Sequence, residues 1–406
     1  MNPSPAFLKI VKDLEKKYPG TFRKATGRSD PRRIPTGVFH LDRALGGGIP
    51  VRRVTLIGGH KATYKTTLAT KIMANWQRNC TLCMRPPAWC ACDPDVTKPM
   101  FAVVIDIEHT FDESHAVELG VDPDRLYIAR PASGEAACEY AETIAQTPDV
   151  GLVIADSLAA LTPGVDMEKS YTDSAARGLR ARLIARLMRA LTVKLDKPHL
   201  PCTAIMLNHL LPSQQNMGDI WPGGETQKYL SSVVLKLVTL DKETLEIQND
   251  GEEMLKSYGS KAKPLVGPRM EHIRFLIEHS KISLGSRLGE FDMVIETGDG
   301  FTFGDIDDYD DVFKVARRLG TIEDRGQGKG YGINGQIFQT QRAIREGWAA
   351  DPEGYALFKA QLCGMTPGKL ALVLPEDPAH ALDPARLNGK GQMVDSQERE
   401  SGEPLI

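Results

Sequence analysis

Apolar stretches long enough to cross a bilayer are absent from the sequence, whose longest hydrophobic segments have the length of single strands. The amino-terminal segment MNPSPAFLKIVKDLEKK is charged and amphipathic, and it lacks the continuous apolar region of a secretory signal. A large excess of either charge is also absent, because the 406 residues carry a formal net charge of -3. We therefore expect a cytoplasmic protein with no membrane partner, on which any nucleic-acid surface is a local patch.

A cysteine pattern typical of a disulfide framework is missing too, since three of the seven cysteines are scattered at positions 138, 202 and 363. The other four gather in CTLCMRPPAWCAC with the spacing C-x2-C-x6-C-x-C. In a reducing compartment, cysteines at such spacing bind metal more often than they form disulfides. The loop 80–92 therefore predicts a closed, structural Zn²⁺ site, with reduced thiols as the alternative. Its ligands are Cys80, Cys83, Cys90 and Cys92.

Near-continuous apolar runs alternate with helical segments through most of the chain. Such runs are typical of strands covered on both faces in a mostly parallel sheet. We therefore expect a doubly wound α/β fold whose ligands bind at the carboxyl ends of the strands. The predicted strands are residues 54–59, 101–108, 150–157, 202–209 and 233–240.

The segments on either side of this core differ from it in composition. A Gly-rich hairpin between short helices near 307–319 and 337–347 predicts a small α+β domain. The last residues are rich in Pro, Gly, Asp and Glu, which predicts an acidic disordered tail. The expected order is an N-terminal helix and linker at 1–33, the core at 34–300, the α+β domain at 301–365 and the tail at 366–406.

The segment GGHKATYKTT follows a predicted strand and opens a predicted helix. Backbone amides in such a loop, together with the helix N-terminus, bind phosphate groups. We expect Lys65 to reach the β- and γ-phosphates of ATP and Thr66 to bind Mg²⁺. Tyr64 stands at the second glycine of G-x-x-x-x-G-K-[ST], so an ordinary turn with an exposed lysine stays open. The loop comprises Gly59, His60, Lys61, Ala62, Thr63, Tyr64, Lys65, Thr66 and Thr67.

Acidic residues end two successive predicted strands downstream of this loop. Glu108 is placed to polarise the water that attacks the γ-phosphate, and Asp156 is placed to support Mg²⁺. Asn208 and His209 end a further strand, where we expect them to sense the γ-phosphate. Capping of helix N-termini is the alternative role for the two acids.

A helix predicted at 174–195 has two distinct faces. Leucines recur every four residues on the face expected to pack on the sheet. Between Asp173 and Asp196 no acidic residue neutralises the basic face, so contact with DNA phosphates explains it better than a solvated surface does. The basic residues are Arg177, Arg180, Arg182, Arg186 and Arg189.

Four segments, in order and at matching spacing, resemble the RecA family of DNA strand-exchange proteins, and within it the phage UvsX-like branch. The likeness covers about residues 34–345. Tyr64 and His209 are similar to the UvsX-like branch rather than to bacterial RecA. The segments are IPTGVFHLDRALGGGIPVRRVTLIGG, VVIDIEHTFDESHAVELGVDPDRLYIARPASGEAACE, VIADSLAALTP and LNHLLPSQQNMGDIWPGGETQKYLSS.

The resemblance implies a RecA-like P-loop ATPase core and assigns roles within it. Glu108 is implied as the catalytic glutamate, and Asp156 as the metal-supporting aspartate. Asp112 and His115 are implied near the adenine, although His115 replaces the family's tyrosine. The DNA-binding loops map to about 163–178 and 210–226. The second loop contributes Gln214, Gln215, Asn216, Met217 and Trp221, and it ends through Gly223 and Gly224.

The resemblance also implies that ATP lies between protomers, with cations supplied by the neighbour. The segment EHSKIS (278–283) resembles the strand that carries them. Lys281 aligns with one cation, and His279 replaces the other. Lys228 is placed to relay DNA contact to this interface. A solvated lysine at a strand end is the alternative for Lys281.

We therefore expect an ATP- and Mg²⁺-dependent recombinase that forms a helical filament on single-stranded DNA through its N-terminal polymerisation helix. It would pair this strand with homologous duplex DNA and hydrolyse ATP in response to DNA. Single-strand-binding and mediator proteins are further expected partners, and a phage protein would act in the host cytoplasm. A hexameric helicase of the same fold and a DNA-binding regulator without ATPase activity are the alternatives. The N-terminal helix and the paired glycines favour the filament.

Overall fold

The structure, a computed structural model, describes residues 3–18, 32–92, 98–162, 164, 175–196, 201–212, 219–240, 270–282, 287–297, 301–326 and 329–364. Within this part of the chain, the main sheet comprises β3 (Val54–Gly59), β4 (Phe101–Asp106), β5 (Leu126–Ala129), β6 (Val150–Asp156), β7 (Thr203–His209), β10 (Val233–Thr239), β11 (Met270–Ser280), β12 (Leu288–Val294) and β13 (Ile306–Asp307). Their order across the sheet is β13-β12-β11-β10-β3-β7-β6-β4-β5.

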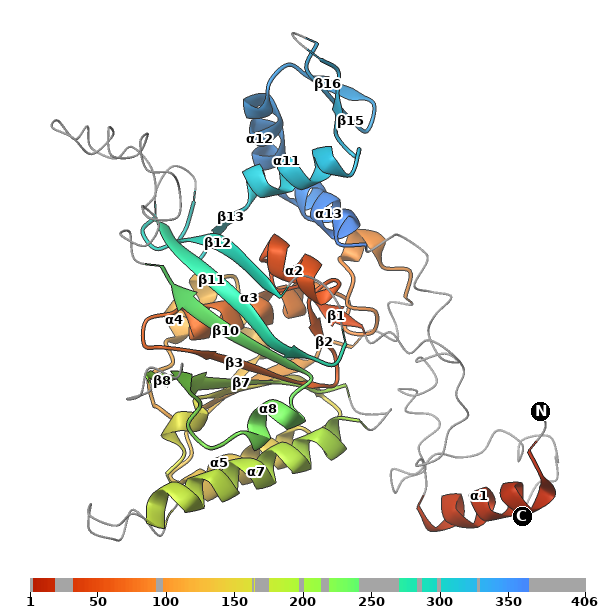
Figure 1. Ribbon diagram of the computed structural model, residues 1–406, viewed down its shortest axis with the longest axis vertical. Helices are drawn as coiled ribbons and strands as arrows, with labels where there is room; N and C mark the ends of the chain where they lie inside the picture. The colour runs from red at the N-terminus through yellow and green to blue at the C-terminus, as the bar shows by residue number, and fades with distance from the viewer. Residues whose placement is uncertain are drawn as a thin grey trace, which may run out of the picture.

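The strands from β10 to β5 pair in parallel, whereas β10, β11, β12 and β13 pair antiparallel with one another. Figure 1 shows this twisted sheet through the centre of the molecule. The predicted α/β fold with a mostly parallel sheet is confirmed. The five predicted strands are present with ends shifted by up to two residues, while β5, β12 and β13 were not predicted.

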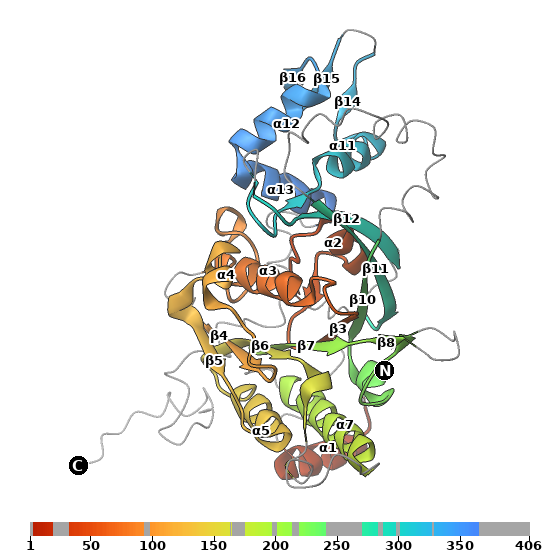
Figure 2. The ribbon, with the colours of Figure 1, turned by 90° about the vertical axis from the view of Figure 1, so that its left-hand side faces the viewer.

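Helices cover both faces of the sheet, as Figure 2 shows: α3 (Lys65–Arg78) and α4 (Glu113–Glu118) lie on one face, and α5 (Gly134–Ile144) and α7 (Ala175–Leu195) on the other. Leu68, Ile72 and Trp76 of α3 are fully buried in the first core, and Ile184 and Leu191 of α7 in the second. Burying each such side chain contributes about 1.5–3 kcal/mol to stability. Helices packed on both faces thus hold the strands, and with them the loops at the strand ends, in place.

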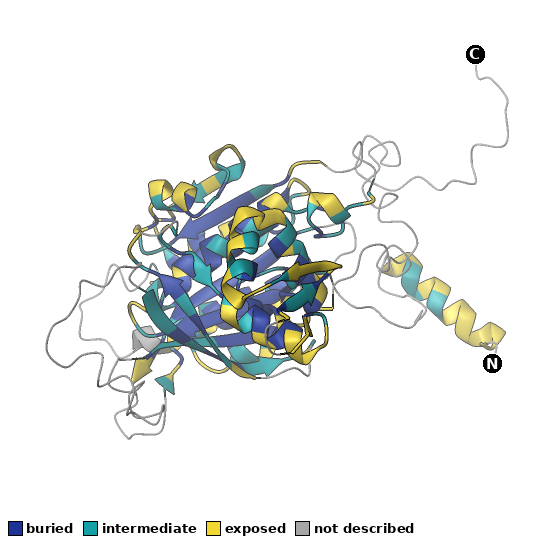
Figure 3. Ribbon diagram, turned by 90° about the horizontal axis from the view of Figure 1, so that it is seen from above, coloured by how far each residue is buried: buried dark blue, intermediate teal, exposed yellow. Residues whose placement is uncertain are grey.

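Short elements join the sheet to the rest of the core. They are β1 (Arg33–Ile34), α2 (Phe39–Leu45), β2 (Ile49–Pro50), β8 (Leu211–Pro212), β9 (Asp219–Ile220) and α8 (Thr226–Leu230). The N-terminal helix α1 (Pro5–Lys17) has no buried residue, and its apolar Phe7, Leu8 and Ile10 are exposed. Figure 3 shows this contrast with the dark, buried strands. No described helix combines the length and the apolar character that a membrane span requires.

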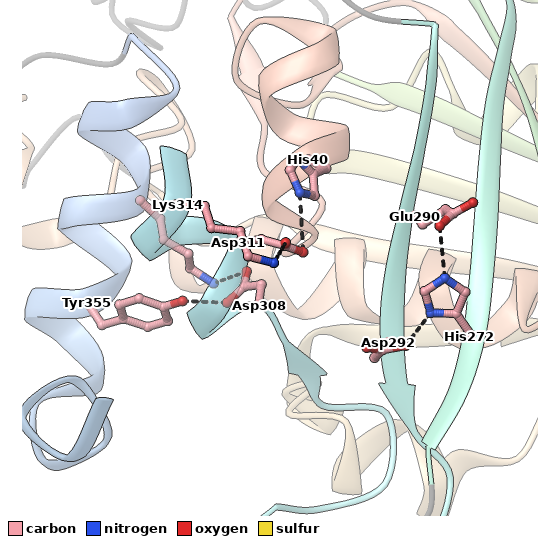
Figure 4. Close-up of polar contacts among 9 residues, drawn as sticks. His40, His272, Glu290, Asp292, Asp308, Asp311, Lys314 and Tyr355 are labelled. Atoms are coloured by element: carbon pink, nitrogen blue, oxygen red, sulfur yellow. Dashed lines mark hydrogen bonds and ion pairs between the residues drawn. The ribbon is translucent and has the colours of Figure 1, made fainter. Parts of the chain in front are cut away.

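The C-terminal part consists of α11 (Tyr309–Arg318), β14 (Glu323–Asp324), β15 (Tyr331–Ile333), β16 (Gln336–Phe338), α12 (Gln341–Ala350) and α13 (Pro352–Leu362). It has its own hydrophobic cluster, which Phe39 of α2 joins. His40 Nε2 lies 3.2 Å from Asp311 Oδ2, and Tyr355 donates to Asp308 over 2.6 Å (Figure 4). The predicted helices and hairpin are present, but α13 was not predicted. The predicted tail lies outside the described residues, and so does the predicted linker except for Arg32 and Arg33.

A histidine links two strands of the antiparallel edge. His272 of β11 lies between two carboxylates of β12, with Nδ1 2.5 Å from Asp292 and Nε2 3.0 Å from Glu290 (Figure 4). These hydrogen bonds, that to Asp292 above all, raise the pKa of His272 to about 9 against the opposing effect of burial. At neutral pH, His272 is therefore protonated, and its ion pairs with Asp292 and Glu290 join β11 to β12.

Candidate functional site

The loop between β3 and α3 lies at the carboxyl end of a parallel strand. A Cβ on Gly59 would lie 2.3 Å from Thr63 Oγ1, so this position accepts only glycine. Tyr64 has φ 58°, in the left-handed region, where a non-glycine residue costs about 1–2 kcal/mol. Its partly buried ring packs against the first core. The phosphate-loop pattern has a glycine at this position because glycine adopts a left-handed backbone conformation without strain, and Tyr64 adopts that same conformation.

Lys65 is only 4% exposed, although it begins α3. Its Nζ donates to the carbonyl of His60 over 2.6 Å and to Thr63 Oγ1 over 3.4 Å. Burial lowers the pKa of Lys65 to about 8, against the opposing charges of Asp156 and Glu108. A buried ammonium whose close acceptors are neutral oxygens favours an anion beside it, and a phosphate group fits this requirement.

Asp156 and Thr66 meet beneath this loop, where Thr66 Oγ1 donates to Asp156 Oδ2 over 2.6 Å. Burial raises the pKa of Asp156, and the bond from Thr66 opposes that change. A hydroxyl and a carboxylate at this distance form the oxygen donor set that Mg²⁺ prefers next to a nucleotide phosphate. Asp156 therefore bonds a side chain of the phosphate loop and does not cap a helix.

Glu108 lies on a loop that a buried acid fixes. Asp106 accepts from the backbone N–H groups of Thr110 and Phe111 and from Arg130 Nε, at 3.0–3.2 Å. The sequence analysis missed Asp106 and Arg130, although an acid at a strand end was a usable signal.

The carboxylate of Glu108 is bonded in turn. Glu108 Oε1 accepts from Ser157 Oγ and lies 2.9 Å from His209 Nε2. Three of the sequence-predicted strand ends are thus brought together, and Ser157 is an unpredicted member of the group. A carboxylate so oriented can polarise a water molecule.

Asn208 is fully buried and points elsewhere. Its Nδ2 donates to the Pro222 carbonyl over 2.9 Å and to Gln227 Oε1 over 2.8 Å. Gln227, also fully buried, donates to the carbonyls of Pro222 and Gly224. These bonds differ from the predicted contact of Asn208 with a γ-phosphate, because they use its amide to hold the segment after β9. No local pattern marked Gln227.

The phosphate loop also contacts the segment that follows residue 218. His60 Nε2 lies 2.9 Å from Asp219 Oδ1, and Lys236 of β10 forms an ion pair with the other oxygen of Asp219. We call this contact the His60–Asp219 bridge. The hydrogen bonds of Lys236 and His60 lower the pKa of Asp219 against burial. The bridge joins the predicted nucleotide loop to the predicted second DNA loop.

The predicted basic face of α7 is partly as expected. Arg182, Arg186 and Arg189 are exposed, and none of them forms an ion pair within the described residues. Arg180 instead donates from Nε to the Leu161 carbonyl over 2.9 Å, which draws it off this stripe. The side chain of Arg177 lies outside the described residues. The three exposed arginines are hereafter the arginine stripe.

The predicted second DNA loop is described only at its end, because Gln214, Gln215, Asn216 and Met217 lie outside the described residues. Trp221 is buried, and a Cβ on Gly58 would lie 2.2 Å from its ring. The absence of a side chain at Gly58 gives the Trp221 ring an internal site in this structure, and the DNA-binding role of Trp221 stays a prediction. Gly223 has φ 90° and abuts Ile184, whereas Gly224 has φ 82° in open surroundings.

Lys281 and His279 lie at one end of the strands, and the phosphate loop lies at the other end. His279 pairs with Val234, at the start of β10, whereas the phosphate loop leaves β3 beside Leu237. Lys281 Nζ donates to the Tyr229 carbonyl over 2.6 Å, and burial lowers its pKa. His279 Nε2 is buried and has no hydrogen-bond partner among the described residues.

Three further predicted residues have local partners. Lys228 pairs with Glu225 at 2.6 Å and lies over the Trp221 ring. Asp112 caps α4 by accepting from the His115 N–H over 3.1 Å, and the His115 ring contacts Phe303. The adenine contact of Asp112 and His115 stays a prediction.

The cysteine loop brings its four thiols together. The Sγ atoms of Cys80, Cys83, Cys90 and Cys92 all lie within 4.8 Å of one another. Within the described residues, this is the one group of acidic, histidine or cysteine side chains close enough to bind a metal. Four clustered sulfurs suit zinc.

Comparison with known proteins agrees with this geometry. The family described as RecA N-terminal domain matches residues 96–264. Protein RecA of Nautilia profundicola is 36% identical over 224 residues, which cover 53% of this chain and 58% of that protein. Protein RecA of Chlorobium chlorochromatii is 32% identical over 304 residues, which cover 73% of this chain and 74% of that protein. Because the chain is 32% identical to that protein over about three quarters of its length, and because it carries a phosphate loop and two strand-end acids, it belongs to the RecA family.

Proposed function

We propose that this protein is an ATP-dependent recombinase that assembles as a helical filament on single-stranded DNA and exchanges strands with a homologous duplex. One observation carries the proposal: the phosphate loop and Lys281 lie at opposite ends of the strands of one sheet. Val233 pairs with both Thr55 and Ser280, while Gly59 lies beside Leu237. The four-residue step from Thr55 to Gly59 spans about 13 Å along β3. Lys281 is thus poorly placed to serve its own phosphate loop and exposed enough to serve a neighbour's.

A cation supplied by the neighbouring protomer makes ATP hydrolysis depend on assembly. The exposed apolar residues of α1 support assembly as well, because Phe7, Leu8 and Ile10 remain 46–57% exposed within the described residues. In this proposal α1 is the polymerisation helix and packs on the next protomer. His279 would add a second interface group, and Lys228 would transmit DNA contact to it.

The cofactors in this proposal are ATP and Mg²⁺. Lys65 and the backbone N–H groups from Gly59 to Thr67 would bind the phosphates, and Thr66 with Asp156 would hold the metal. ATP with Mg²⁺ supplies the phosphoryl group for hydrolysis. Glu108 would orient the attacking water. His209 would hold the Glu108 carboxylate in position through their 2.9 Å contact. Asp112 and His115 would border the adenine. The cysteine loop would hold a structural Zn²⁺ outside this chemistry.

DNA would bind on the arginine stripe and on the segments 163–178 and 210–226. Three exposed guanidinium groups without ion-pair partners in the described chain offer contacts to phosphates in any sequence. The His60–Asp219 bridge supplies a route between the two sites, because any ligand that moves one of its residues acts on the other. Membership of the phage UvsX-like branch is part of the proposal and is supported by Tyr64 and His209.

An ATPase assay with and without single-stranded DNA tests the activity directly. We expect DNA to raise the turnover at least tenfold. Electron microscopy with DNA and a non-hydrolysable ATP analogue separates the filament from the alternative, a hexameric helicase of the same fold. Helical filaments are expected. Closed rings, or a turnover that ignores DNA, would overturn the proposal.

A further inference from the structure

The cysteine loop begins two residues after α3, the helix that starts at the phosphate loop. Its sulfurs have spacings close to those of a metal centre. Four sulfurs around one Zn²⁺ at about 2.3 Å lie about 3.8 Å apart. Cys83 Sγ and Cys90 Sγ are 3.7 Å apart, and all four sulfurs lie within 4.8 Å of one another.

A backbone N–H group is directed at one of these sulfurs: Cys92 N–H donates to Cys90 Sγ over 3.4 Å. A bond of this kind orients the ligand of a metal. The spacing of the sulfurs and this bond together form an arrangement that suits one metal ion.

Two arginines belong to or contact this loop. The guanidinium of Arg32 donates to the carbonyl of Leu82, which directly precedes Cys83. Arg85 is only 4% exposed, and its Nη2 has no partner among the described residues. Neither arginine forms an ion pair with a carboxylate in the part of the chain described. Zn²⁺ with four thiolates carries a net charge of about -2, which supplies the missing counter-charge.

Arg32 also fixes the start of the core. It directly precedes β1, and its carbonyl accepts from the Val51 N–H over 2.8 Å. On its other side the loop contributes Pro86, Pro87 and Ala88 to a cavity of about 600 Å³, which α13 also lines. The loop thus lies between the beginning of the core and the C-terminal part.

We propose that one Zn²⁺ bound by Cys80, Cys83, Cys90 and Cys92 uses Arg32 as its compensating cation and so fixes the start of the core to the cysteine loop. The inference rests on the zinc site proposed above, and it is independent of strand exchange. The metal controls how firmly residue 32 is held. ATP chemistry at the phosphate loop does not use it.

Metal analysis of the full chain, purified without chelator, tests the first part. We expect one zinc per chain and, after exchange, the intense absorption of Co²⁺ bound by four thiolates. Cys83→Ser should lose the metal, whereas Cys138→Ser, outside the loop, should retain it. Far less than one zinc per chain, or a disulfide between loop cysteines in protein kept reduced, would overturn the proposal.

Competition with a chromophoric chelator tests the role of Arg32. Loss of a group that orients or balances metal ligands costs about 10–100-fold in metal affinity. We expect a loss of about tenfold for Arg32→Gln and a partial recovery for Arg32→Lys. Arg33→Gln, whose Nε bonds the Leu45 carbonyl instead, is the matched control and should change the affinity less than about twofold. An unchanged affinity in Arg32→Gln would refute the charge pairing.

Limited trypsin digestion tests the anchoring. We expect cleavage after Arg32 to become at least tenfold faster when the zinc is removed, while ATP binding stays within about threefold. Equal cleavage with and without metal would refute the anchor, and loss of ATP binding would refute its separation from the phosphate loop. All these readings are taken without DNA, so they succeed or fail separately from the proposed recombinase activity.

Discussion

The two ends of the strands of the central sheet carry different parts of the proposed site. These ends are called the carboxyl edge and the opposite edge below. At the carboxyl edge of the parallel strands, Lys65, Glu108 and Asp156 lie together with their hydrogen-bond partners. At the opposite edge, beside the starts of β10 and β3, Lys281 and His279 have no phosphate loop of their own chain beside them. Sheet topology therefore builds the nucleotide half of the site locally. In the proposed filament, the cationic half would come from a second protomer.

For a single variant of the phosphate loop, a large effect is expected. Lys65→Ala removes the ammonium that is buried among neutral oxygens, and it should lower ATP affinity and turnover by more than about 100-fold. Binding of a fluorescent ATP analogue and phosphate release measure both. Lys329→Ala, an exposed lysine on the C-terminal hairpin, is the control. Near-normal turnover in Lys65→Ala would remove the phosphate loop from the account.

The arginine stripe tests whether the DNA surface is separate from both edges. Arg182→Ala and Arg189→Ala should each weaken binding to single-stranded DNA equally for all sequences. Each should also lower the magnitude of the salt slope by about one. Fluorescence anisotropy at several salt concentrations measures the slope. Sequence-dependent losses, or an unchanged slope, would mean that the stripe faces another ligand.

A matched pair of variants isolates the backbone of the phosphate loop. Tyr64→Ala and Tyr64→Gly both remove the aromatic ring, but only alanine keeps a Cβ at φ 58°. The glycine variant should be more stable than the alanine variant by about 1 kcal/mol. Urea unfolding gives this difference, and ATP turnover should stay within a few-fold of the native value. Equal stabilities would show that the left-handed conformation is not maintained.

The smallest effect is expected at the antiparallel edge, through His272. Its pKa is raised from the ordinary 6.5 to about 9, so its protonation stabilises the fold. That contribution is fully present below about pH 6.5 and is lost as the pH rises through about 9. The melting temperature of His272→Gln should therefore approach that of the native protein as the pH increases over this range. A difference independent of pH would contradict the ion pairs with Asp292 and Glu290.

The sequence predicted the parallel part of the sheet better than the antiparallel part for a physical reason. Buried parallel strands produce continuous apolar runs, and their ends place polar residues at a common edge, so Glu108, Asp156 and His209 could be found. The strands β11 and β12 are only half buried, and their alternating residues give a weaker pattern.

Some positions depend on contacts that no local pattern contains. Trp221 occupies the space that Gly58 leaves free, although the two are far apart in sequence. Asn208 is drawn toward Gln227 by hydrogen bonds that form only after the chain folds back. These residues could not be assigned without the structure, because their partners come from different elements.

A mixing experiment tests most directly whether the two edges belong to one composite site. Lys281→Ala should bind ATP almost normally yet lose DNA-stimulated hydrolysis, by analogy with a cation supplied in trans, whose effect is about 10³–10⁵ in rate. Lys65→Ala should also be inactive alone. When the two variants are mixed on single-stranded DNA, some interfaces combine an intact Lys65 with an intact Lys281, and turnover should return to a measurable fraction of the native rate. Full DNA-stimulated turnover by Lys281→Ala alone, or no recovery in mixed filaments that electron microscopy shows to have formed, would contradict the account.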